Sequence, residues 1–182
     1  MKWLPAAWSG LFILSMLLVS CAPPAYQCLD PLGCLKIWPG GPVVIGTILA
    51  TSGEQRPEAI GSLQGVEIAL DDKVKLLGHP IKLIRSGTDC SPESAREAAT
   101  EISTYGGISA VLGPTCESEL EQATSILLNA GIPLLGPVRN SNDARKMTDQ
   151  LLTAIQEVAV QMPDRTIYIP RQALLRKLDL SP

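Results

Sequence analysis

Short apolar runs alternate with amphipathic segments through the middle of the chain. Val43–Ala50 (VVIGTILA) is almost entirely apolar, a pattern typical of a strand that is buried on both faces of a parallel sheet. Thr51-Ser52-Gly53 follows as a turn signal. Apolar residues then recur every three to four positions, as on one face of a helix, at Leu63, Val66, Leu70 and Val74. The pattern therefore opens with one strand and one helix.

The same alternation continues as far as Pro137. Strands are predicted at Ile81–Arg85, Ala110–Leu112 and Pro133–Leu135, with a helix between the last two at Glu119–Leu128. Ser91-Pro92-Glu93 is typical of a helix start, because it offers a hydroxyl N-cap, a proline at the first position and an acid in the first turn. Strands that alternate with helices imply right-handed crossovers. The predicted fold class is α/β, with a mostly parallel, doubly wound sheet in three layers.

Residues 1–21 have the pattern of an export signal. Lys2 precedes the apolar run Leu11–Val19, which is too short to span a bilayer comfortably. Leu18-Val19-Ser20-Cys21 resembles the lipobox of bacterial lipoproteins, in which the cysteine is acylated. We therefore expect a lipid anchor at Cys21 that holds the chain on the extracytoplasmic face of the cell membrane. An ordinary signal peptide and an uncleaved anchor are the alternatives.

Two further segments flank the alternating region, which forms a predicted domain over residues 43–141. Residues 22–42 are rich in proline and glycine, and this composition predicts a semi-extended linker outside the core. In residues 142–182, helical spacing of apolar positions predicts a helix over Asp143–Met162. A strand at Thr166–Ile169 and a short helix over Pro170–Leu178 are expected to follow it.

Four cysteines follow the lipobox, and an even number favours disulfides in an exported chain. Three pairings are possible. We favour a local Cys28–Cys34 bond and a Cys90–Cys116 bond within the domain. Cys90 follows the second strand and Cys116 follows the third, so both lie at the same edge of a parallel sheet.

The composition and the polar residues argue against catalysis and against nucleic-acid binding. The net charge is −3 and aromatic residues make up 4% of the chain, so neither a basic surface nor a base-stacking platform is predicted. His79 stands alone in a Gly-His-Pro turn, Asp71 and Asp72 diverge on a helix, and no glycine-rich phosphate motif occurs. The cysteines lack the paired C-x-x-C spacing of a zinc site. We expect no enzyme activity, no metal and no cofactor.

Ligand binding is better supported by the pattern. Ligands of open α/β sheets lie beyond the carboxyl ends of the strands. This sequence places Ser52, Thr115 and the segment from Gly136 to Ser141 at that edge. The segment from Thr115 to Ser118 also begins a helix, whose free N–H groups favour a carboxylate. The alternative is that Thr115 or Ser118 only caps its own helix.

Several ordered motifs resemble the type I periplasmic solute-binding proteins, specifically the leucine/isoleucine/valine-binding family of ABC transporter receptors. They are IGTILATSG at residues 45–53, GVEIALDD at 65–72, AVLGP at 110–114, AGIP at 130–133 and Gly136-Pro137. The resemblance covers about residues 43–141 and implies one lobe of that fold. Cys90 and Cys116 stand where some members carry a disulfide, which strengthens the pairing given above.

The resemblance also implies a ligand, a partner and a set of binding residues. The family holds an amino acid's carboxylate with small hydroxyl residues after the third and fourth strands. By position these correspond to Glu117 or Ser118, and to Asn140 or Ser141. An amino acid of branched-chain type is the implied ligand, and an ABC transporter permease the implied partner. Both matches are imperfect, because Glu117 repels a carboxylate and Arg139 replaces a small residue.

The end of the chain departs from the family pattern. Residues 154–161 and 169–174 resemble a segment near the end of the family's chain. About 140 folded residues are too few for two lobes of ordinary domain size. We therefore expect most of the second lobe to be missing and amino-acid binding to be weak or absent. The alternatives are a one-lobe sensory or protein-interaction module and a non-functional remnant.

Overall fold

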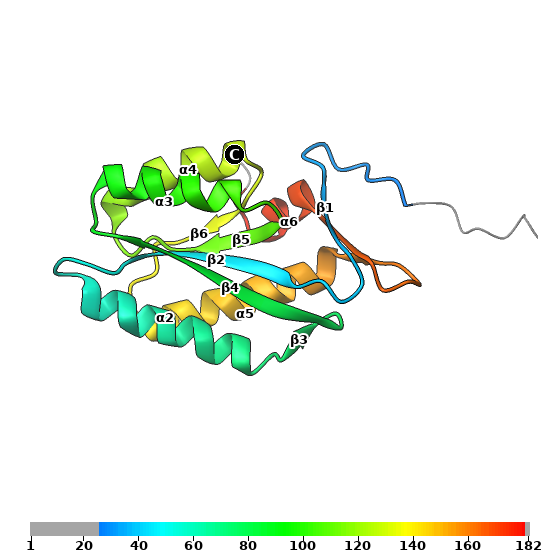
Figure 1. Ribbon diagram of the computed structural model, residues 1–182, viewed down its shortest axis with the longest axis horizontal. Helices are drawn as coiled ribbons and strands as arrows, with labels where there is room; N and C mark the ends of the chain where they lie inside the picture. The colour runs from blue at the N-terminus through cyan, green and yellow to red at the C-terminus, as the bar shows by residue number, and fades with distance from the viewer. Residues whose placement is uncertain (1–25, 181–182) are drawn as a thin grey trace, which may run out of the picture.

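The main sheet has five strands and forms the centre of the molecule (Figure 1). The computed structural model describes residues 26–180. The strands are β2 (Val43–Ala50), β3 (Lys75–Leu76), β4 (His79–Thr88), β5 (Ile108–Leu112) and β6 (Leu134–Leu135), and their order is β3-β4-β2-β5-β6. β4, β2, β5 and β6 run parallel, while β3 is an antiparallel edge strand. The mostly parallel, doubly wound sheet predicted from the sequence is confirmed.

β2 is the central strand of this sheet. It pairs with β4 over its whole length, from Val43 opposite Ile81 to Ala50 opposite Thr88. On its other side it pairs with β5. All its residues except Val44 are buried. Side chains on both faces of β2 therefore point into a core, and this explains its uninterrupted apolar run.

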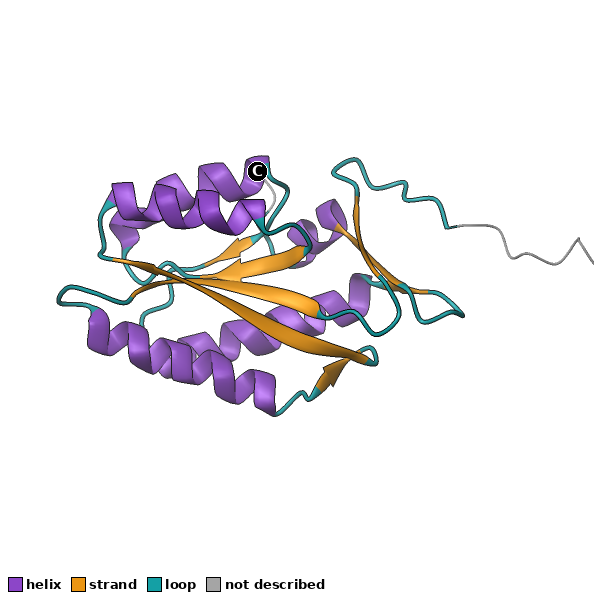
Figure 2. Cartoon of the chain, viewed as in Figure 1, coloured by secondary structure: helices purple, strands orange, loops and turns teal. Residues whose placement is uncertain are grey.

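Two pairs of helices cover the two faces of the sheet (Figures 1 and 2). α2 (Arg56–Asp71) and α5 (Ser141–Val158) lie on one face. α3 (Pro92–Thr104) and α4 (Leu120–Asn129) lie on the other. The sheet separates two apolar clusters: Ile45 packs with residues of α2 and α5, whereas Ile48 packs with residues of α3 and α4. The predicted three layers are present.

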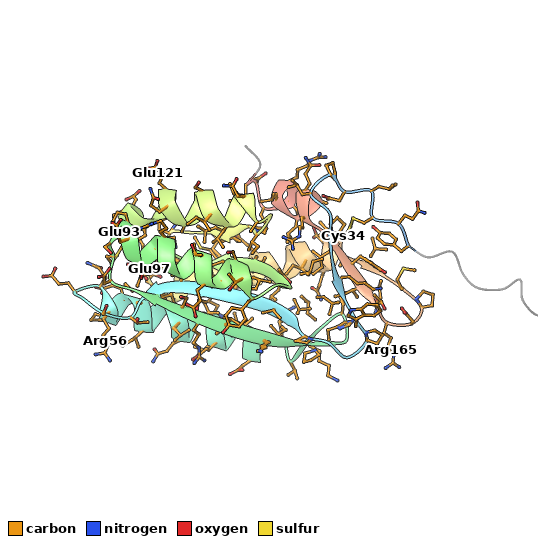
Figure 3. The ribbon with its side chains drawn as sticks, turned by 45° about the horizontal axis from the view of Figure 1, so that its top comes forward. Cys34, Arg56, Glu93, Glu97, Glu121 and Arg165 are labelled. Carbon is orange, nitrogen blue, oxygen red and sulfur yellow. A yellow bond between two sulfur atoms is a disulfide. The ribbon has the colours of Figure 1, made fainter. Side chains whose placement is uncertain are left out.

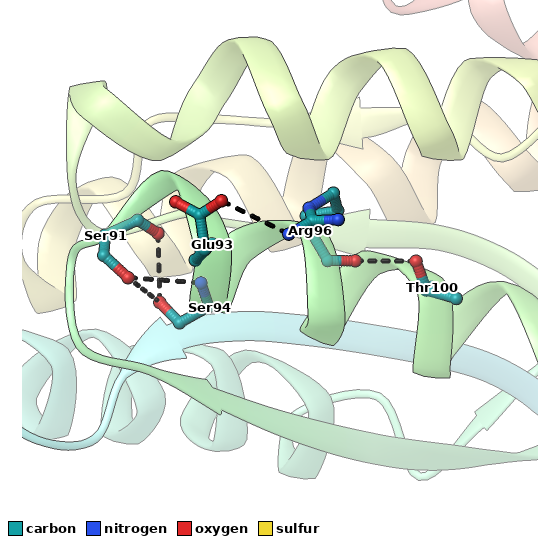
Figure 4. A network of polar contacts seen from close by, with 5 residues as sticks. All are labelled: Ser91, Glu93, Ser94, Arg96 and Thr100. Carbon is teal, nitrogen blue, oxygen red and sulfur yellow. Dashed lines mark hydrogen bonds and ion pairs between the residues drawn. The ribbon is translucent and has the colours of Figure 1, made fainter.

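α3 begins as the sequence predicts. Ser91 is its N-cap, and the Ser91 hydroxyl accepts a hydrogen bond from the N–H of Ser94 at 3.2 Å. The Ser94 hydroxyl also lies 3.0 Å from the Ser91 carbonyl oxygen (Figure 4). Glu93 pairs with Arg96 at 3.2 Å and places its negative charge at the positive end of the helix dipole. This cap holds the loop that follows β4.

A second, antiparallel sheet lies at one end of the molecule. Its strands are β1 (Cys34–Ile37), β7 (Val160–Gln161) and β8 (Ile167–Pro170), in the order β1-β8-β7, and α6 (Arg171–Lys177) follows β8. The prediction that residues 22–42 form a linker outside the core is wrong for β1, because Leu35 and Ile37 are buried in the same cluster as Ile167 and Ile169 of β8. Alternation of apolar residues was the available signal, and the surrounding prolines and glycines obscured it.

Two sets of polar contacts position this small sheet, one within its own region and one with the main sheet. The Asp30 carboxylate accepts hydrogen bonds from two N–H groups in the first turn of α6, each at 3.1 Å. The buried His79 ring lies between the carbonyl oxygens of Gly41 and Arg165, each 2.8 Å from a ring nitrogen. His79 is the first residue of β4 rather than a turn residue. Its contacts give it a structural role.

Both favoured disulfides are present. Cys28 and Cys34 are joined across a Cα separation of 5.9 Å, and Cys90 and Cys116 across 5.5 Å. The second bond links the loop after β4 to the loop after β5. The predicted export signal and Cys21 lie outside the described residues. Among the helices of residues 26–180, none combines the length and the apolar character needed to cross a membrane.

The two helices of one layer approach each other closely at a glycine. A Cβ atom at Gly65 of α2 would lie 2.2 Å from the backbone oxygen of Ser141, at the start of α5. At Gly61, one turn earlier on α2, a Cβ atom would have no neighbour within 4 Å. The absence of a side chain at residue 65 therefore sets the distance between α2 and α5.

Gly65→Ala is expected to lower the free energy of unfolding by about 1–3 kcal/mol, because the added methyl group forces the backbones of α2 and α5 apart. Gly61→Ala is the matched control on the same helix. It should raise the free energy of unfolding by up to about 1 kcal/mol, because alanine has the higher helix propensity. Urea unfolding measures both variants. Equal effects of the two substitutions would contradict close packing at residue 65.

Candidate functional site

A hollow lies beyond the carboxyl ends of the parallel strands, with a volume of about 690 Å³. Loops that follow β2, β4, β5 and β6 all contribute to its wall, because parallel strands end at the same edge of a sheet. The lining residues are Glu54, Gln55, Glu58, Asp89, Cys90, Thr115, Cys116, Glu117, Ser118 and Arg139.

The strand order explains why a hollow forms at this place. From β2 the chain crosses to β4 on one side, and from β4 it returns to β5 on the other side of β2. The loops after β2 and β5 therefore lead to helices on opposite faces of the sheet, and a crevice opens between them. Such a switch point is where open α/β sheets bind ligands.

Two hydroxyl groups at the hollow are also bound to the protein. The Thr115 Oγ1 atom accepts a hydrogen bond from the N–H of Ala50 at 3.1 Å, which leaves its own proton available to a ligand. The Ser118 hydroxyl donates to the Cys90 carbonyl oxygen at 2.9 Å, so its proton is already used. Neither residue caps a helix: the short helix η1 (Glu117–Glu119) begins after Cys116 without a side-chain cap.

One ion pair crosses the hollow. The Arg139 guanidinium lies 3.4 Å from a carboxylate oxygen of Glu117, and both side chains are mostly exposed. In the loop after β6, Arg139 therefore partly neutralises Glu117, which follows β5. A ligand carboxylate at this place competes with Glu117 for the guanidinium.

Asp89 adds a firmly ionised carboxylate to the wall. The hydroxyls of Ser91 and Ser94, together with the N–H of Ser91, lower the pKa of Asp89 from 3.8 to about 2. These donors are the residues that cap α3. The charge of Asp89 is therefore present throughout the physiological pH range.

The lining as a whole is acidic. Glu54, Glu58, Asp89 and Glu117 supply four carboxylates, against the one guanidinium of Arg139. In the first turn of α2, the N–H of Arg56 already donates to the Gly53 carbonyl oxygen at 3.4 Å and Pro57 has no N–H, so the N–H of Glu58 is the backbone donor left for a ligand. The arrangement favours a ligand that carries a positive group, and offers a carboxylate only Arg139, Thr115 and this single N–H group.

The structure brings together three of the six residues predicted to bind ligand. Thr115, Glu117 and Ser118 line the hollow, and their role as ligand contacts stays a prediction. The Ser52 hydroxyl instead donates to the Thr88 carbonyl oxygen at 3.2 Å. Asn140 caps α5, where its Oδ1 atom accepts from the N–H of Asp143 at 2.9 Å, and Ser141 is the first residue of that helix. These last three are outside the lining set.

Sequence reasoning missed most of the charged lining. Asp89 directly follows the second strand, at the edge already assigned to Cys90, so strand order was a sufficient signal for it. Glu54 and Glu58 lie at the turn and first helical turn after β2, where acids also serve the helix dipole, and no separate signal distinguishes the two roles. Arg139 stands where the family has a small residue, and this difference was a signal in the sequence for its place in the lining.

A buried carboxyl group lies directly behind the hollow. Glu119 is fully buried, and a carboxylate oxygen of Glu119 lies within 4.8 Å of the sulfur atoms of Cys90 and Cys116. Neither carboxylate oxygen has a hydrogen-bond partner of good geometry among the described residues. Burial raises the pKa of Glu119 above its ordinary value of 4.5, against the opposing effect of the nearby Thr88 hydroxyl. While the disulfide persists, this group offers a metal ion one carboxylate and no thiolate.

A second hollow, of about 660 Å³, lies along α5 and the end of α6. Its lining includes Arg145, Lys146, Asp149 and Lys177. Apart from Leu135 of β6, the lining consists of helix residues and the turn after α6, so strand ends do not converge on it. The hollow at the switch point is therefore the candidate binding site.

Glu119→Gln tests the cost of the buried carboxyl. Because the folded chain holds the Glu119 proton to a higher pH than the unfolded chain does, the native protein loses stability as pH rises from about 4.5 through the raised pKa. The Glu119→Gln variant has no carboxyl group at this position, so its stability does not fall in this way as pH rises. We expect its free energy of unfolding to be close to that of the native chain at pH 4 and higher than it at pH 8.

Urea unfolding at the two pH values measures the effect, with Glu121→Gln, an exposed position of α4, as the control for removal of one surface carboxylate. A native-minus-variant difference that stays constant from pH 4 to pH 8 would show that Glu119 does not titrate differently in the folded chain.

Comparisons with known proteins indicate the family to which this chain belongs. A family model described as periplasmic binding protein matches residues 42–159. Similar solved structures include a leucine-binding protein from Thermotoga maritima (22% identity, TM-score 0.48, 50% of this chain and 26% of that chain) and an ABC transporter substrate-binding protein from Sphaerobacter thermophilus (29%, 0.49, 51% and 25%). A branched-chain amino acid transporter substrate-binding protein from Streptococcus pneumoniae, solved with isoleucine, is a third (23%, 0.48, 51% and 28%).

The chain spans about a quarter of the length of these three solved proteins. Among proteins with curated descriptions, none matches it. The family match covers 118 residues, from the entry into β2 to the end of α5, and so includes the whole main sheet and the hollow at its edge. The chain belongs to the periplasmic binding protein family.

Proposed function

We propose that this chain is an extracytoplasmic solute-binding component of an ABC transporter, anchored to the membrane through Cys21. The observation that carries the proposal is the hollow at the switch point of a sheet that belongs to the periplasmic binding protein family. Residues 43–141 are the proposed ligand-binding lobe. The role requires no catalytic group.

The proposed solute is an amino acid of branched-chain or related type. Its ammonium group would face the carboxylates of Asp89, Glu54 and Glu58, and its carboxylate would be held by Arg139 and the Thr115 hydroxyl. Glu117 opposes the contact between Arg139 and the ligand carboxylate, because the Glu117 carboxylate itself pairs with Arg139. Affinity is therefore expected to be low.

Closure of a second lobe is the usual way in which periplasmic binding proteins bury a ligand. The described residues supply one wall of such a site and leave the hollow open to solvent. A single wall buries less ligand surface and excludes water poorly. The competing function is a sensory or protein-interaction module, in which a partner protein rather than a solute covers this edge.

Thermal unfolding of residues 22–182 under oxidising conditions tests solute binding. The chain is heated alone and with leucine, isoleucine, valine or another amino acid. A ligand at 100 times its dissociation constant adds about 2.7 kcal/mol to the free energy of unfolding, so the melting temperature should rise for the amino acid that binds. A cooperative transition that no amino acid shifts would retire the transport function in favour of the interaction module.

Glu117→Ser is expected to strengthen binding of the amino acid that gives the largest shift. Repulsion between two like charges about 4 Å apart amounts to about 1 kcal/mol in water, which corresponds to roughly fivefold in affinity. Glu121→Ser, outside the hollow, is the matched control and should leave the affinity unchanged. Calorimetric titration compares the variants, and weaker binding by Glu117→Ser would show that Glu117 contacts the ligand favourably.

A further inference from the structure

Aromatic side chains gather on the small sheet. The described residues contain four of them, and three belong to this part of the fold: Tyr26, Trp38 and Tyr168. The rings of Tyr26 and Tyr168 have centroids 4.5 Å apart. In a chain with 4% aromatic residues, this concentration at one end of the molecule is distinctive. We call Tyr26, Lys36, Trp38 and Tyr168 the aromatic face.

Lys36 occupies the middle of the aromatic face. Its ammonium nitrogen lies 3.4 Å from the ring centroid of Trp38 and 5.6 Å from that of Tyr168. Lys36 and Tyr168 are directly opposite each other in the pairing of β1 with β8, so both side chains leave the same side of the sheet. In the turn between β7 and β8, hydrogen bonds from Thr166 lower the pKa of Asp164, and Asp164 lies close enough to Lys36 for the lysine charge to lower it further.

The aromatic face is the outer side of the small sheet. Leu35 and Ile37 alternate with Lys36 along β1 and point into the core. Trp38, by contrast, is 64% exposed, and Leu29 in the segment that leads into β1 is 87% exposed. Tyr26 and Tyr168 are half-buried, and their rings pack against each other. Trp38 and Leu29 therefore leave apolar surface in contact with solvent at this end of the molecule.

The position of the aromatic face in the chain, close to Cys21, indicates which surface lies against it. Tyr26 is five residues beyond Cys21, so the two are at most about 18 Å apart even when the chain is fully extended. A lipid anchor at Cys21 therefore brings the bilayer surface within reach of the face. Because β1 is folded and Tyr26 is only five residues beyond Cys21, the chain between them is too short to hold the domain away from the membrane.

We propose that the aromatic face rests on the bilayer to which Cys21 is attached. Tryptophan and tyrosine side chains are enriched at the level of the lipid headgroups, where one end of the ring is apolar and the other wet. The Lys36 ammonium can reach anionic headgroups while its apolar stem lies along the rings. This inference rests on the proposed lipid anchor at Cys21.

Contact through this face orients the whole molecule. The small sheet and the hollow lie at opposite ends of the main sheet: Cys34 and Arg165 mark one end in Figure 3, and Arg56 and Glu93 mark the other. With the aromatic face on the membrane, the carboxyl ends of the strands point away from it. The hollow then opens toward the solute rather than toward the lipid.

Fluorescence of Trp38 tests the proposal, because Trp38 is the one tryptophan after Cys21. The full chain is purified from a bacterial host that processes lipoproteins and placed in vesicles of phosphatidylethanolamine and phosphatidylglycerol. We expect the emission to shift to shorter wavelength and to be quenched when the lipids carry bromine on their acyl chains. Emission as in water, with unchanged quenching by aqueous iodide, would overturn the proposal and point to a protein partner for this face.

Lys36→Gln and Lys146→Gln separate specific contact from general attraction to anionic lipid. Replacement of Lys36 should lower the equilibrium constant for contact between the aromatic face and these vesicles about fivefold. This is the equivalent of about 1 kcal/mol for one lysine at an anionic surface. Lys146 is an exposed residue of α5 and its replacement should change nothing. Equal effects of the two substitutions would argue against contact through the aromatic face.

Mass spectrometry of the N-terminal fragment distinguishes failure of the anchor from failure of this inference. If Cys21 carries no acyl chain, the anchor proposal is wrong, and the chain from Cys21 is then coupled to a maleimide lipid through that thiol, since the other four cysteines form disulfides. Trp38 emission in the coupled sample still reports whether the aromatic face contacts lipid. A water-like spectrum in both samples rejects the face itself.

Discussion

Burial of β2 on both faces is the constraint on which the rest of the structure depends. Its side chains belong to two separate cores, so helices must cover both sides of the sheet. Its neighbours β4 and β5 are parallel to it, and parallel neighbours require crossover helices. Those crossovers leave every parallel strand with its carboxyl end at one edge. The location of the hollow is therefore a consequence of how β2 is buried.

The backbone segments at the edge that carries the hollow pack closely against one another. A Cβ atom at Gly113 would lie 2.0 Å from the carbonyl oxygen of Ile48, and one at Gly136 would lie 1.9 Å from that of Gly113. The ends of β2, β5 and β6 can converge only because these residues lack side chains. The Cys90–Cys116 disulfide then ties the loop after β4 to the loop after β5. Behind that bond lie the buried Glu119 carboxyl and the Thr88 hydroxyl, which have no hydrogen-bond partner among the described residues, so burial disfavours both.

The two ends of the main sheet differ in chemistry. Carboxylates and hydroxyls line the hollow at the carboxyl end, where strand geometry leaves polar loops around an opening. At the amino end, the small sheet covers the core with Leu35 and Ile37 and presents aromatic rings outward. His79 of β4 holds this small sheet against the main sheet, and Asp30 ties the segment before β1 to the start of α6. The same fold thus separates a polar end, which carries the hollow, from an amphipathic end close to the proposed anchor.

The sequence by itself determined the α/β class, the alternation of the parallel strands with their helices and the start of α3 at Ser91, because each follows from local periodicity or capping chemistry. It favoured the observed disulfide pairs among three possible pairings, from strand topology and from the family resemblance. It also placed Thr115, Glu117 and Ser118 at the correct edge. Only the tertiary structure showed that β1 belongs to a sheet, since its partner β8 is more than a hundred residues away. It alone brought Arg139 to Glu117 and enclosed Glu119, because pairings and burial between distant segments leave no periodic trace in a single sequence.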